Sequence, residues 1–243
     1  MFNLDEQVKA YNETVGDLTD GVDCDKCKNK GYYETLDGIY IESHKCKCLR
    51  ERKINRTIAD SGLADVFDVY TFDLFDTETP YHLHMKQKAQ SFIAEGGYRW
   101  FMVAGQIGSG KSHICTAISK TMIERGMSFK YLSYAQDMPR ITKRMDSGYI
   151  DIKEKAEHEF DNLKNVNVLY IDDYLKGEKT DKLFELINHR YNNKTCITIF
   201  STEKSMQEQK HIDEAIVSRI YQRCGGYWVE VAKGDGKNYR FGG

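Results

Sequence analysis

The sequence has very little proline, no long apolar run and almost no net charge. Its two prolines, Pro80 and Pro139, leave no proline-rich linker that would mark a domain boundary, and we find no internal repeat or low-complexity tract. No apolar run approaches the roughly 20 residues that a membrane-spanning helix needs. The N-terminal segment MFNLDEQVKAYNE is polar and carries acids, unlike a secretory signal peptide. These absences predict a cytoplasmic protein with no membrane partner.

The charge balance argues against one large class of nucleic-acid-binding proteins. A net charge of −2 and a pI near 6.4 do not favour binding through overall positive charge, so any contact with DNA has to come from local patches. The length of 243 residues allows one large domain, or one domain with a small appendage. An apolar content of 40% is enough to build a core.

Four of the seven cysteines cluster near the N-terminus, as Cys24 and Cys27 in CDKC and as Cys46 and Cys48 in CKC. Disulfides are not expected in the cytoplasm, whereas two close cysteine pairs can place four thiolates around one tetrahedral Zn²⁺. The segment between the pairs, KNKGYYETLDGIYIESHK, predicts a β-hairpin that brings them together. We therefore predict a structural zinc site, with His44 as a substitute ligand if Cys46 or Cys48 fails to reach the metal. The alternative is a set of four free or redox-active thiols.

A basic segment follows the second cysteine pair. It contains one acid, Glu51, among the basic residues Lys47, Arg50, Arg52, Lys53 and Arg56. Such a run is typical of a solvated helix face. The alternative is a strip that contacts single-stranded DNA or an acidic partner surface.

The strongest motif is GQIGSGKS, which follows the apolar run Phe101–Ala104 and precedes apolar residues at helical spacing. The pattern GxxxxGK[ST] lets glycine backbone and a helix N-terminus point successive N–H groups at phosphate. Lys111 is then expected to reach the β- and γ-phosphates of ATP, and the Ser112 hydroxyl to bind Mg²⁺. The predicted nucleotide-binding residues are Gly105, Gln106, Ile107, Gly108, Ser109, Gly110, Lys111, Ser112 and His113. The alternative is a glycine-rich turn with an incidental lysine.

After residue 60 the pattern alternates between strands and helices. The expected strands are Trp100–Gly105, Phe129–Ser133, Val166–Asp172, Cys196–Ser201 and Trp228–Ala232, and the expected helices are 81–95, 111–125, 152–164, 181–192 and 205–222. Alternating βα units with continuous apolar strands predict an α/β fold, with a mostly parallel sheet covered on both faces. Ligands of such folds bind beyond the carboxyl ends of the strands, where the glycine-rich loop lies.

A second motif ends another apolar strand. In NVNVLYIDDY, the run from Val168 to Ile171 leads into Asp172 and Asp173, and buried carboxylates are costly unless a cation or polarised water is present. Beside a phosphate-binding loop, Asp172 is expected to hold Mg²⁺ through its water shell, and Asp173 to orient or deprotonate the attacking water. The alternative is a strand that ends in a polar turn.

Two later segments add candidate residues. CITIFSTEKS ends in Ser201, Thr202 and Glu203, polar side chains that can reach the γ-phosphate or the catalytic water, although any exposed strand end is polar. In DEAIVSRIYQR, Arg219 and Arg223 lie one helical turn apart. They are typical of surface ion pairs, and they also suit an arginine finger supplied to the γ-phosphate of a neighbouring subunit.

Together, TFDLF, GQIGSGKSH, VLYIDDY, DEAIVSRIYQR and the closing KNYRF resemble the bacterial and phage DnaC/DnaI-type helicase loaders, a branch of the AAA+ ATPases. The resemblance spans approximately residues 60 to 243, and the cysteine-bearing lobe is similar to the zinc-containing lobe of the DnaI type. It implies a zinc-binding lobe over residues 1–60, the part that contacts the replicative helicase in relatives. It also implies a three-layer αβα AAA+ ATPase domain over residues 61–243.

The resemblance implies roles for individual residues. It assigns phosphate and Mg²⁺ binding to Lys111 and Ser112, the Walker B aspartate to Asp172, the catalytic-acid position to Asp173 and the arginine finger to Arg219. Glu203 stands where many relatives have a sensor asparagine, so Thr202 is expected to compensate. We find no C-terminal lid domain with a second sensor arginine, which agrees with this branch.

By this resemblance the chain is an ATP-dependent loader of the hexameric replicative DNA helicase on single-stranded DNA. It would self-associate with ATP and release the helicase on hydrolysis. Three alternatives remain: an IstB-type transposition helper, a non-hydrolysing ATP-gated module for single-stranded DNA, and a small-molecule P-loop kinase. A kinase needs a lid with phosphate-clamping arginines, and residues 137–160 offer only Arg140, Lys143 and Arg144. In a loader these three residues are candidates for a DNA-facing surface.

Overall fold

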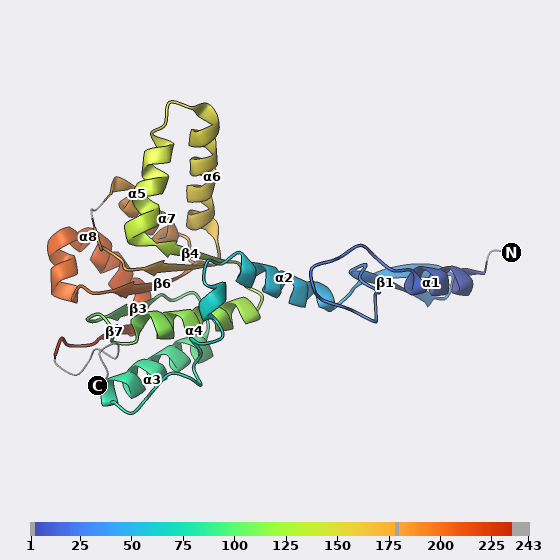
Figure 1. The fold of residues 1–243 in the computed structure, drawn as a ribbon, viewed down its shortest axis with the longest axis horizontal. Helices are drawn as coiled ribbons and strands as arrows, with labels where there is room; N and C mark the ends of the chain where they lie inside the picture. Colours follow the sequence, from blue (N-terminus) through green and yellow to red (C-terminus); the bar gives the residue numbers. More distant parts are fainter. Residues whose placement is uncertain (1–2, 178–179, 235–243) are drawn as a thin grey trace. The chain divides into compact units, whose positions relative to one another are not determined.

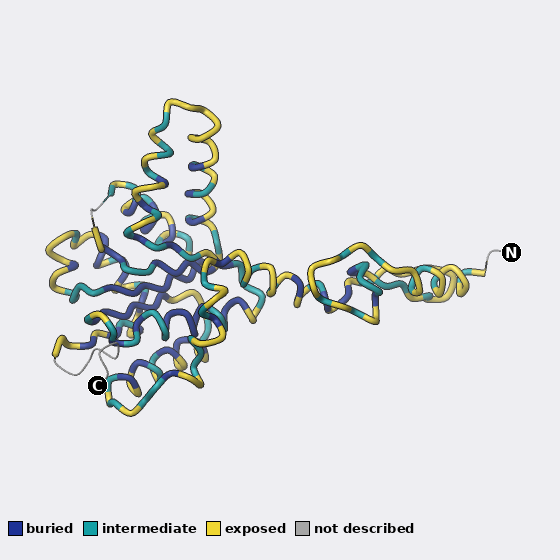
Figure 2. Tube along the Cα trace, in the orientation of Figure 1, coloured by how far each residue is buried: buried dark blue, intermediate teal, exposed yellow. Residues whose placement is uncertain are grey.

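The computed structural model describes residues 3–177 and 180–234, and the KNYRF segment lies outside them. The chain divides into two compact units, Met1–Ala59 and Asp60–Gly243. Figure 1 traces both units, and Figure 2 shows which of their residues are buried. The division falls at the end of the helix that carries the basic segment.

The N-terminal unit contains one hairpin and two helices. In chain order these are α1 (Leu4–Glu13), β1 (Tyr32–Asp37), β2 (Tyr40–Lys45) and α2 (Cys48–Ala59). β1 pairs antiparallel with β2, which confirms the hairpin predicted between the cysteine pairs. Among the described residues of this unit, the buried apolar side chains are those of Cys27, Cys46 and Cys48. The unit therefore has almost no apolar core of its own.

A five-stranded parallel sheet forms the centre of the larger unit, with the strand order β4-β5-β6-β3-β7. In chain order the strands are β3 (Phe101–Ala104), β4 (Phe129–Ser133), β5 (Val168–Asp172), β6 (Ile197–Thr202) and β7 (Trp228–Glu230). These strands confirm the five predicted ones, with small shifts of their bounds. β3 and β6 are buried along their whole length, as expected of central strands in a sheet covered on both faces.

Helices cover both faces of this sheet (Figure 1). On one face, α4 (Lys111–Glu124) packs against the sheet and α3 (Pro80–Glu95) packs against α4. The opposite face carries α5 (Tyr134–Met145), α6 (Ile150–Asn165), α7 (Asp181–Asn192) and α8 (Met206–Cys224). A short 3-10 helix, Ala64–Val66, precedes these elements. The predicted three-layer α/β architecture is confirmed.

Two helices differ from the sequence prediction. The sequence does not predict α5, because Pro139 lies inside it and proline normally interrupts a helix. α8 is broken at Asp213, whose backbone is non-helical with φ −160° and ψ 93°. The Asp213 carboxylate accepts a hydrogen bond of 2.9 Å from the Ile216 N–H, so it caps a second helical segment. That segment carries Arg219.

Arg190 of α7 is fully buried. Its guanidinium donates to the backbone carbonyls of Leu163, Val166 and Ile197 at 2.9, 2.9 and 2.6 Å, and to the Thr198 hydroxyl at 3.0 Å. Burial lowers the pKa of Arg190 to about 10, so the side chain stays charged at neutral pH. This one side chain therefore ties the end of α6 and the approach to β5 to the start of β6.

We expect Arg190→Met to destabilise the larger unit. Methionine leaves the three carbonyl oxygens without their donor, and each buried unsatisfied acceptor costs about 1–3 kcal/mol. The free energy of unfolding in urea should therefore fall by about 3 kcal/mol or more. Arg140→Met is the matched control, because that side chain is 47% exposed and its ion pair with Glu159 is a surface pair worth about 0–1 kcal/mol. Equal losses in the two variants would contradict the bridging role.

Candidate nucleotide site and cysteine cluster

The glycine-rich loop between β3 and α4 has a backbone that depends on its glycines. Gly108 and Gly110 have φ values of 76° and 82°, in the region that disfavours a side chain. A Cβ atom on Gly110 would also come within 2.9 Å of Phe75 Cε2. Lys111 begins α4, and its ammonium donates to Gln106 O at 2.7 Å, so it lies over the loop. This arrangement leaves room for a group that binds close to the backbone and the helix N-terminus.

A cavity of about 360 Å³ lies against this loop. It is lined by Tyr70, Ile107, Gly108, Ser109, Gly110, Lys111, Ser112, His113, Asp172, Asp173, Lys176 and Glu203. The predicted loop residues from Ile107 to His113 therefore line one cavity together with both predicted aspartates. Gly105 instead donates its N–H to Thr202 O at 3.0 Å within the sheet, and Gln106 supplies the carbonyl that Lys111 contacts.

His113 holds the segment that precedes α3 against the loop. Its ring stacks on Tyr70 with the centroids 4.8 Å apart, and its Nε2 donates to Thr71 O at 2.8 Å. Phe75 packs edge-on against the same ring. Burial lowers the pKa of His113, which favours the neutral imidazole at pH 7. His113 therefore fixes the position of Tyr70, an aromatic ring that also lines the cavity.

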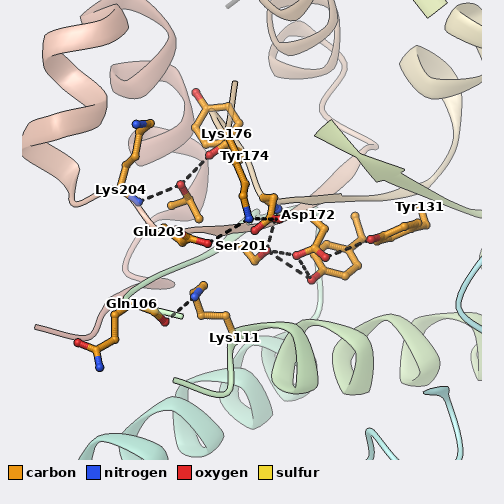
Figure 3. A network of polar contacts seen from close by, with 12 residues as sticks. Gln106, Lys111, Tyr131, Asp172, Tyr174, Lys176, Ser201, Glu203 and Lys204 are labelled. Atoms are coloured by element: carbon orange, nitrogen blue, oxygen red, sulfur yellow. Dashed lines mark hydrogen bonds and ion pairs between the residues drawn. The ribbon is translucent and has the colours of Figure 1, made fainter. Parts of the chain in front are cut away.

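Hydroxyl groups surround the Asp172 carboxylate at the end of β5 (Figure 3). Tyr170 donates to Oδ1 at 2.7 Å, Tyr131 donates to Oδ2 at 3.1 Å, and the Ser201 hydroxyl also donates to Oδ1. Burial raises the pKa of both tyrosines, so both remain protonated donors. These contacts fix the carboxylate at the carboxyl end of the sheet, where ligands of such folds bind.

A tight turn follows β5. The Lys176 N–H donates to Asp173 O at 2.9 Å, and the φ values of Asp173 and Leu175 are 53° and 61°. Aspartate adopts a positive φ more readily than most residues, whereas a bulky residue such as leucine rarely does, so the turn is strained. β6 holds it in place, because the Tyr174 N–H donates to Ser201 O at 2.8 Å. The turn places the Lys176 side chain at the cavity.

Lys176 and Glu203 line the cavity beside the two aspartates. The Lys176 ammonium lies 2.9 Å from Asp173 Oδ2 and 3.3 Å from Glu203 Oε1. Thr202, by contrast, is fully buried, and its hydroxyl donates to Tyr174 O at 2.7 Å. Thr202 therefore does not line the cavity, whereas its neighbour Glu203 does, and a sensor role for Thr202 stays a prediction. Sequence reasoning missed Lys176, whose only signal is its place three residues after Asp173.

Arg219 does not line the cavity of its own chain. Its guanidinium donates to Ala215 O at 2.8 Å and stacks over the Phe184 ring at 5.3 Å. The Arg223 guanidinium donates to Tyr98 O at 2.7 Å, and burial lowers the pKa of Arg223. Of these two arginines, Arg223 contacts carbonyls of distant segments, whereas Arg219 donates to a carbonyl of its own helix.

The four N-terminal cysteines lie together. The sulfurs of Cys24 and Cys46 are 3.6 Å apart, those of Cys27 and Cys48 are 3.5 Å apart, and all four lie within 4.8 Å of one another. Four Zn–S bonds of about 2.3 Å in a tetrahedron place the sulfurs about 3.8 Å apart. The donor set and its spacing therefore fit Zn²⁺.

Two residues near this cluster make contacts of their own, and one of them, Arg52, differs from its predicted role. The His44 ring hydrogen-bonds the Thr35 hydroxyl through Nε2 at 2.7 Å and is not part of the cysteine group. Arg52 is 5% exposed and contacts the Asp20 carboxylate and, at 2.7 Å, Asn29 Oδ1. The prediction that Arg52 belongs to an exposed basic strip is wrong, because its guanidinium braces the loop that carries the first cysteine pair. The other four basic residues of that segment are exposed.

One protein family, described as IstB-like ATP binding protein, matches residues 4–240. The chain belongs to this family. It is similar to two proteins of Bacillus subtilis (strain 168): uncharacterized protein YqaM, 31% identical over 82% of this chain and 67% of that protein, and phage-like element PBSX protein XkdC, 27% identical over 86% and 82%. It is also 23% identical to replicative helicase loader DnaC of Escherichia coli (strain K12), over 70% of this chain and 71% of DnaC.

Solved structures show the same fold. The crystal structure of the DnaC helicase loader aligns with a TM-score of 0.59 and 18% identity, covering 68% of this chain and 98% of that one. The crystal structure of DnaI aligns with a TM-score of 0.54 and 19% identity, covering 74% and 92%. Together with the family match, these similarities make the chain an IstB-related AAA+ ATPase of the DnaC type.

The family is described as ATP-binding, and the cavity residues fit ATP together with Mg²⁺. The Ser109 hydroxyl is buried and has no hydrogen-bond partner among the described residues, at a loop whose φ values suit phosphate binding. Ser112 at the start of α4 and Asp172 at the end of β5 offer the oxygen ligands that Mg²⁺ prefers. Bound Mg²⁺–ATP would supply the phosphate that is transferred to water, and Lys111, Ser112 and Asp172 would hold it.

Within residues 3–177 and 180–234, none of the helices has both the length and the apolar character of a membrane-spanning segment.

We expect the purified protein to contain one zinc ion, held by the four cysteines. Replacing one ligand, in Cys48→Ser, should abolish stoichiometric zinc and unfold the N-terminal unit, which has almost no other core. Elemental analysis measures the zinc, and circular dichroism with and without chelator measures the unfolding. Cys196→Ser, a buried cysteine outside the cluster, is the control and should retain zinc. Four freely titrating thiols and no zinc in the native protein would contradict the assignment.

Proposed function

We propose that this ATPase loads the replicative DNA helicase onto single-stranded DNA during the initiation of replication, in the cytoplasm. The observation that carries the proposal is the position of Arg219, on α8 and away from the cavity of its own chain. An arginine finger must contact a γ-phosphate, so Arg219 can act only on ATP that a neighbouring subunit binds. The similarity to DnaC, a replicative helicase loader, supports the choice of partner.

Each candidate residue has a role in this proposal. Lys111 binds the β- and γ-phosphates, Ser112 and Asp172 hold Mg²⁺, and Asp173 orients the attacking water. Arg219 stabilises the transition-state charge in the next subunit of an ATP-dependent oligomer. ATP then favours the assembled state and hydrolysis favours its release, because the two nucleotides stabilise the subunit contact differently.

The N-terminal unit is the proposed helicase-contacting part. Its hairpin exposes Ile39 and Tyr40, with 74% and 71% of their surfaces accessible. Adjacent exposed apolar side chains on a small metal-stabilised lobe suit contact with a protein partner. Four exposed basic residues on and beside α2, Lys47, Arg50, Lys53 and Arg56, suit an acidic surface or DNA.

An IstB-type transposition helper is the second candidate, and the family match favours it. The two candidates differ in their partners. A loader requires the hexameric helicase and single-stranded DNA, whereas the helper is expected to use a basic N-terminal segment on DNA. In this chain the N-terminal unit is built around four cysteines, which favours the loader.

We expect Arg219→Ala to lower the rate of ATP hydrolysis by at least about a hundredfold, because a finger in trans contributes about a thousandfold or more. Its affinity for ATP should change little, since Arg219 does not line the cavity. The decisive measurement mixes Arg219→Ala with Lys111→Ala. In a random equal mixture, about half of the cavities are intact and about half of the neighbouring fingers are intact. About a quarter of the subunit contacts then have both, so activity should return to about a quarter of the native level. No recovery, together with activity linear in protein concentration, would contradict the trans finger.

The partner is tested separately, by transfer of the hexameric helicase of the same organism onto circular single-stranded DNA. The native ATPase should raise the amount of helicase on the circle, and Arg219→Ala should not release it normally. Full ATPase activity with no helicase transfer and tighter binding to duplex DNA would favour the transposition helper.

We expect one of the three basic residues on α5 to contact DNA. Arg140 and Arg144 lie 2.7 Å from Glu159 carboxylate oxygens and Arg140 also pairs with Asp137, whereas the exposed Lys143 has no ion pair among the described residues. Lys143→Glu should weaken binding to a labelled oligonucleotide and lower the salt dependence of that binding by about one ion. Arg140→Gln is the control and should change both quantities little. Unchanged affinity in Lys143→Glu would remove α5 from the DNA-binding surface.

A further inference from the structure

Glu203 places a third carboxylate in a cavity that binds a polyanion. The carboxylates of Asp172, Asp173 and Glu203 line it together with the ammonium groups of Lys111 and Lys176. Asp172 and Asp173 have assigned tasks with Mg²⁺ and water, but Glu203 has none, and a carboxylate near phosphate is repulsive. The position therefore calls for a nearby cation.

Lys176 is that cation. Its ammonium contacts Asp173 and Glu203 at 2.9 and 3.3 Å. Figure 3 shows Lys176 and Lys111 approaching Glu203 from opposite sides. Lys111 is expected to reach the β- and γ-phosphates of a P-loop nucleotide, and Lys176 lines the same cavity.

The backbone holds Lys176 in this place at a cost. The turn that carries it has positive φ at Asp173 and Leu175, and Leu175 is buried. Strain of this kind persists only where the surroundings enforce it, and it concentrates at functional sites. Here β6 enforces it, through the Tyr174 N–H bonded to Ser201 O and the Tyr174 carbonyl bonded to the Thr202 hydroxyl.

We propose that Lys176 recognises the γ-phosphate and that Glu203 is the residue that positions it. With ATP bound, the Lys176 ammonium keeps its contact with Glu203 and exchanges Asp173 for a terminal phosphate oxygen. Asp173 is then free to orient the attacking water. With ADP bound, the terminal phosphate is missing and Lys176 stays paired with both carboxylates. A glutamate–lysine pair thus takes over the discrimination between nucleoside triphosphate and diphosphate at the sensor position. The inference rests on ATP binding in this cavity and is independent of helicase loading.

The test measures nucleotide affinity without turnover. A fluorescent, non-hydrolysable ATP analogue and fluorescent ADP, each with Mg²⁺, are titrated into the native protein, Lys176→Met and Glu203→Gln. Lys176→Met should bind the ATP analogue about tenfold more weakly, the effect of one lost charge-assisted hydrogen bond, while ADP affinity changes less than about twofold. Glu203→Gln should reduce the preference for the ATP analogue over ADP less than Lys176→Met does.

The double variant Lys176→Met/Glu203→Gln separates recognition from general damage. Removing the unpaired carboxylate as well should restore part of the affinity for the ATP analogue that Lys176→Met loses. Lys182→Met is the matched control, because Lys182 makes the same kind of ion pair, 2.7 Å from Glu185, and does not line the cavity. It should bind both nucleotides as the native protein does.

Equal losses for the ATP analogue and ADP, or no loss for either, would overturn the proposal. Unchanged affinities with faster hydrolysis in Lys176→Met would also overturn it, since the lysine would then only restrain Asp173. Failure of the cavity assignment itself is seen independently: Lys111→Ala would keep its affinity for both nucleotides.

Discussion

The carboxyl end of β6 holds the two halves of the nucleotide cavity together. On one side, Thr202 O accepts the N–H of Gly105, where the glycine-rich loop begins. On the other side, the Ser201 hydroxyl contacts the Asp172 carboxylate, and Ser201 O accepts the N–H of Tyr174. The phosphate-binding loop and the acidic turn come from strands that are not neighbours in the sheet, and β6 is the strand between them. Two consecutive residues, Ser201 and Thr202, therefore hold the cavity together, and their hydroxyl and carbonyl groups are hydrogen-bonded to neighbouring parts of the chain.

The sequence predicts the local motif of the site, but not the positions that are set at the end of β6. The glycine-rich loop is a local motif, so its spacing alone places Ile107–His113 correctly around one cavity. Whether Thr202 or Glu203 lines the cavity depends on strand register and on where β6 leaves the sheet, which the sequence does not reveal; in the structure it is Glu203. Lys176 was missed for a related reason. Its partner Glu203 is 27 residues away, and only the turn geometry after β5 brings them together.

Buried arginines mark another limit of sequence reasoning. From the sequence, Arg190 and Arg52 are expected on the surface, because arginine is charged, and Arg52 lies in a run of exposed basic residues. In the structure both are buried, and each ties together segments that are distant in the chain. Arginine can do this because its planar guanidinium offers five donors in fixed directions, enough to satisfy several carbonyl oxygens at once. The sequence shows that these residues are charged, but the oxygen atoms that accept their hydrogen bonds come together only when the chain folds.

The route from the nucleotide to the proposed arginine finger runs along α8. Glu203 lines the cavity, and two residues later Ser205 caps α8 through a capping box with Glu208. The helix then breaks at Asp213, which caps the segment that bears Arg219. Each segment therefore begins with a side-chain cap of its own. The chain from Glu203 at the cavity to Arg219 therefore consists of two separately capped helical segments that meet at Asp213.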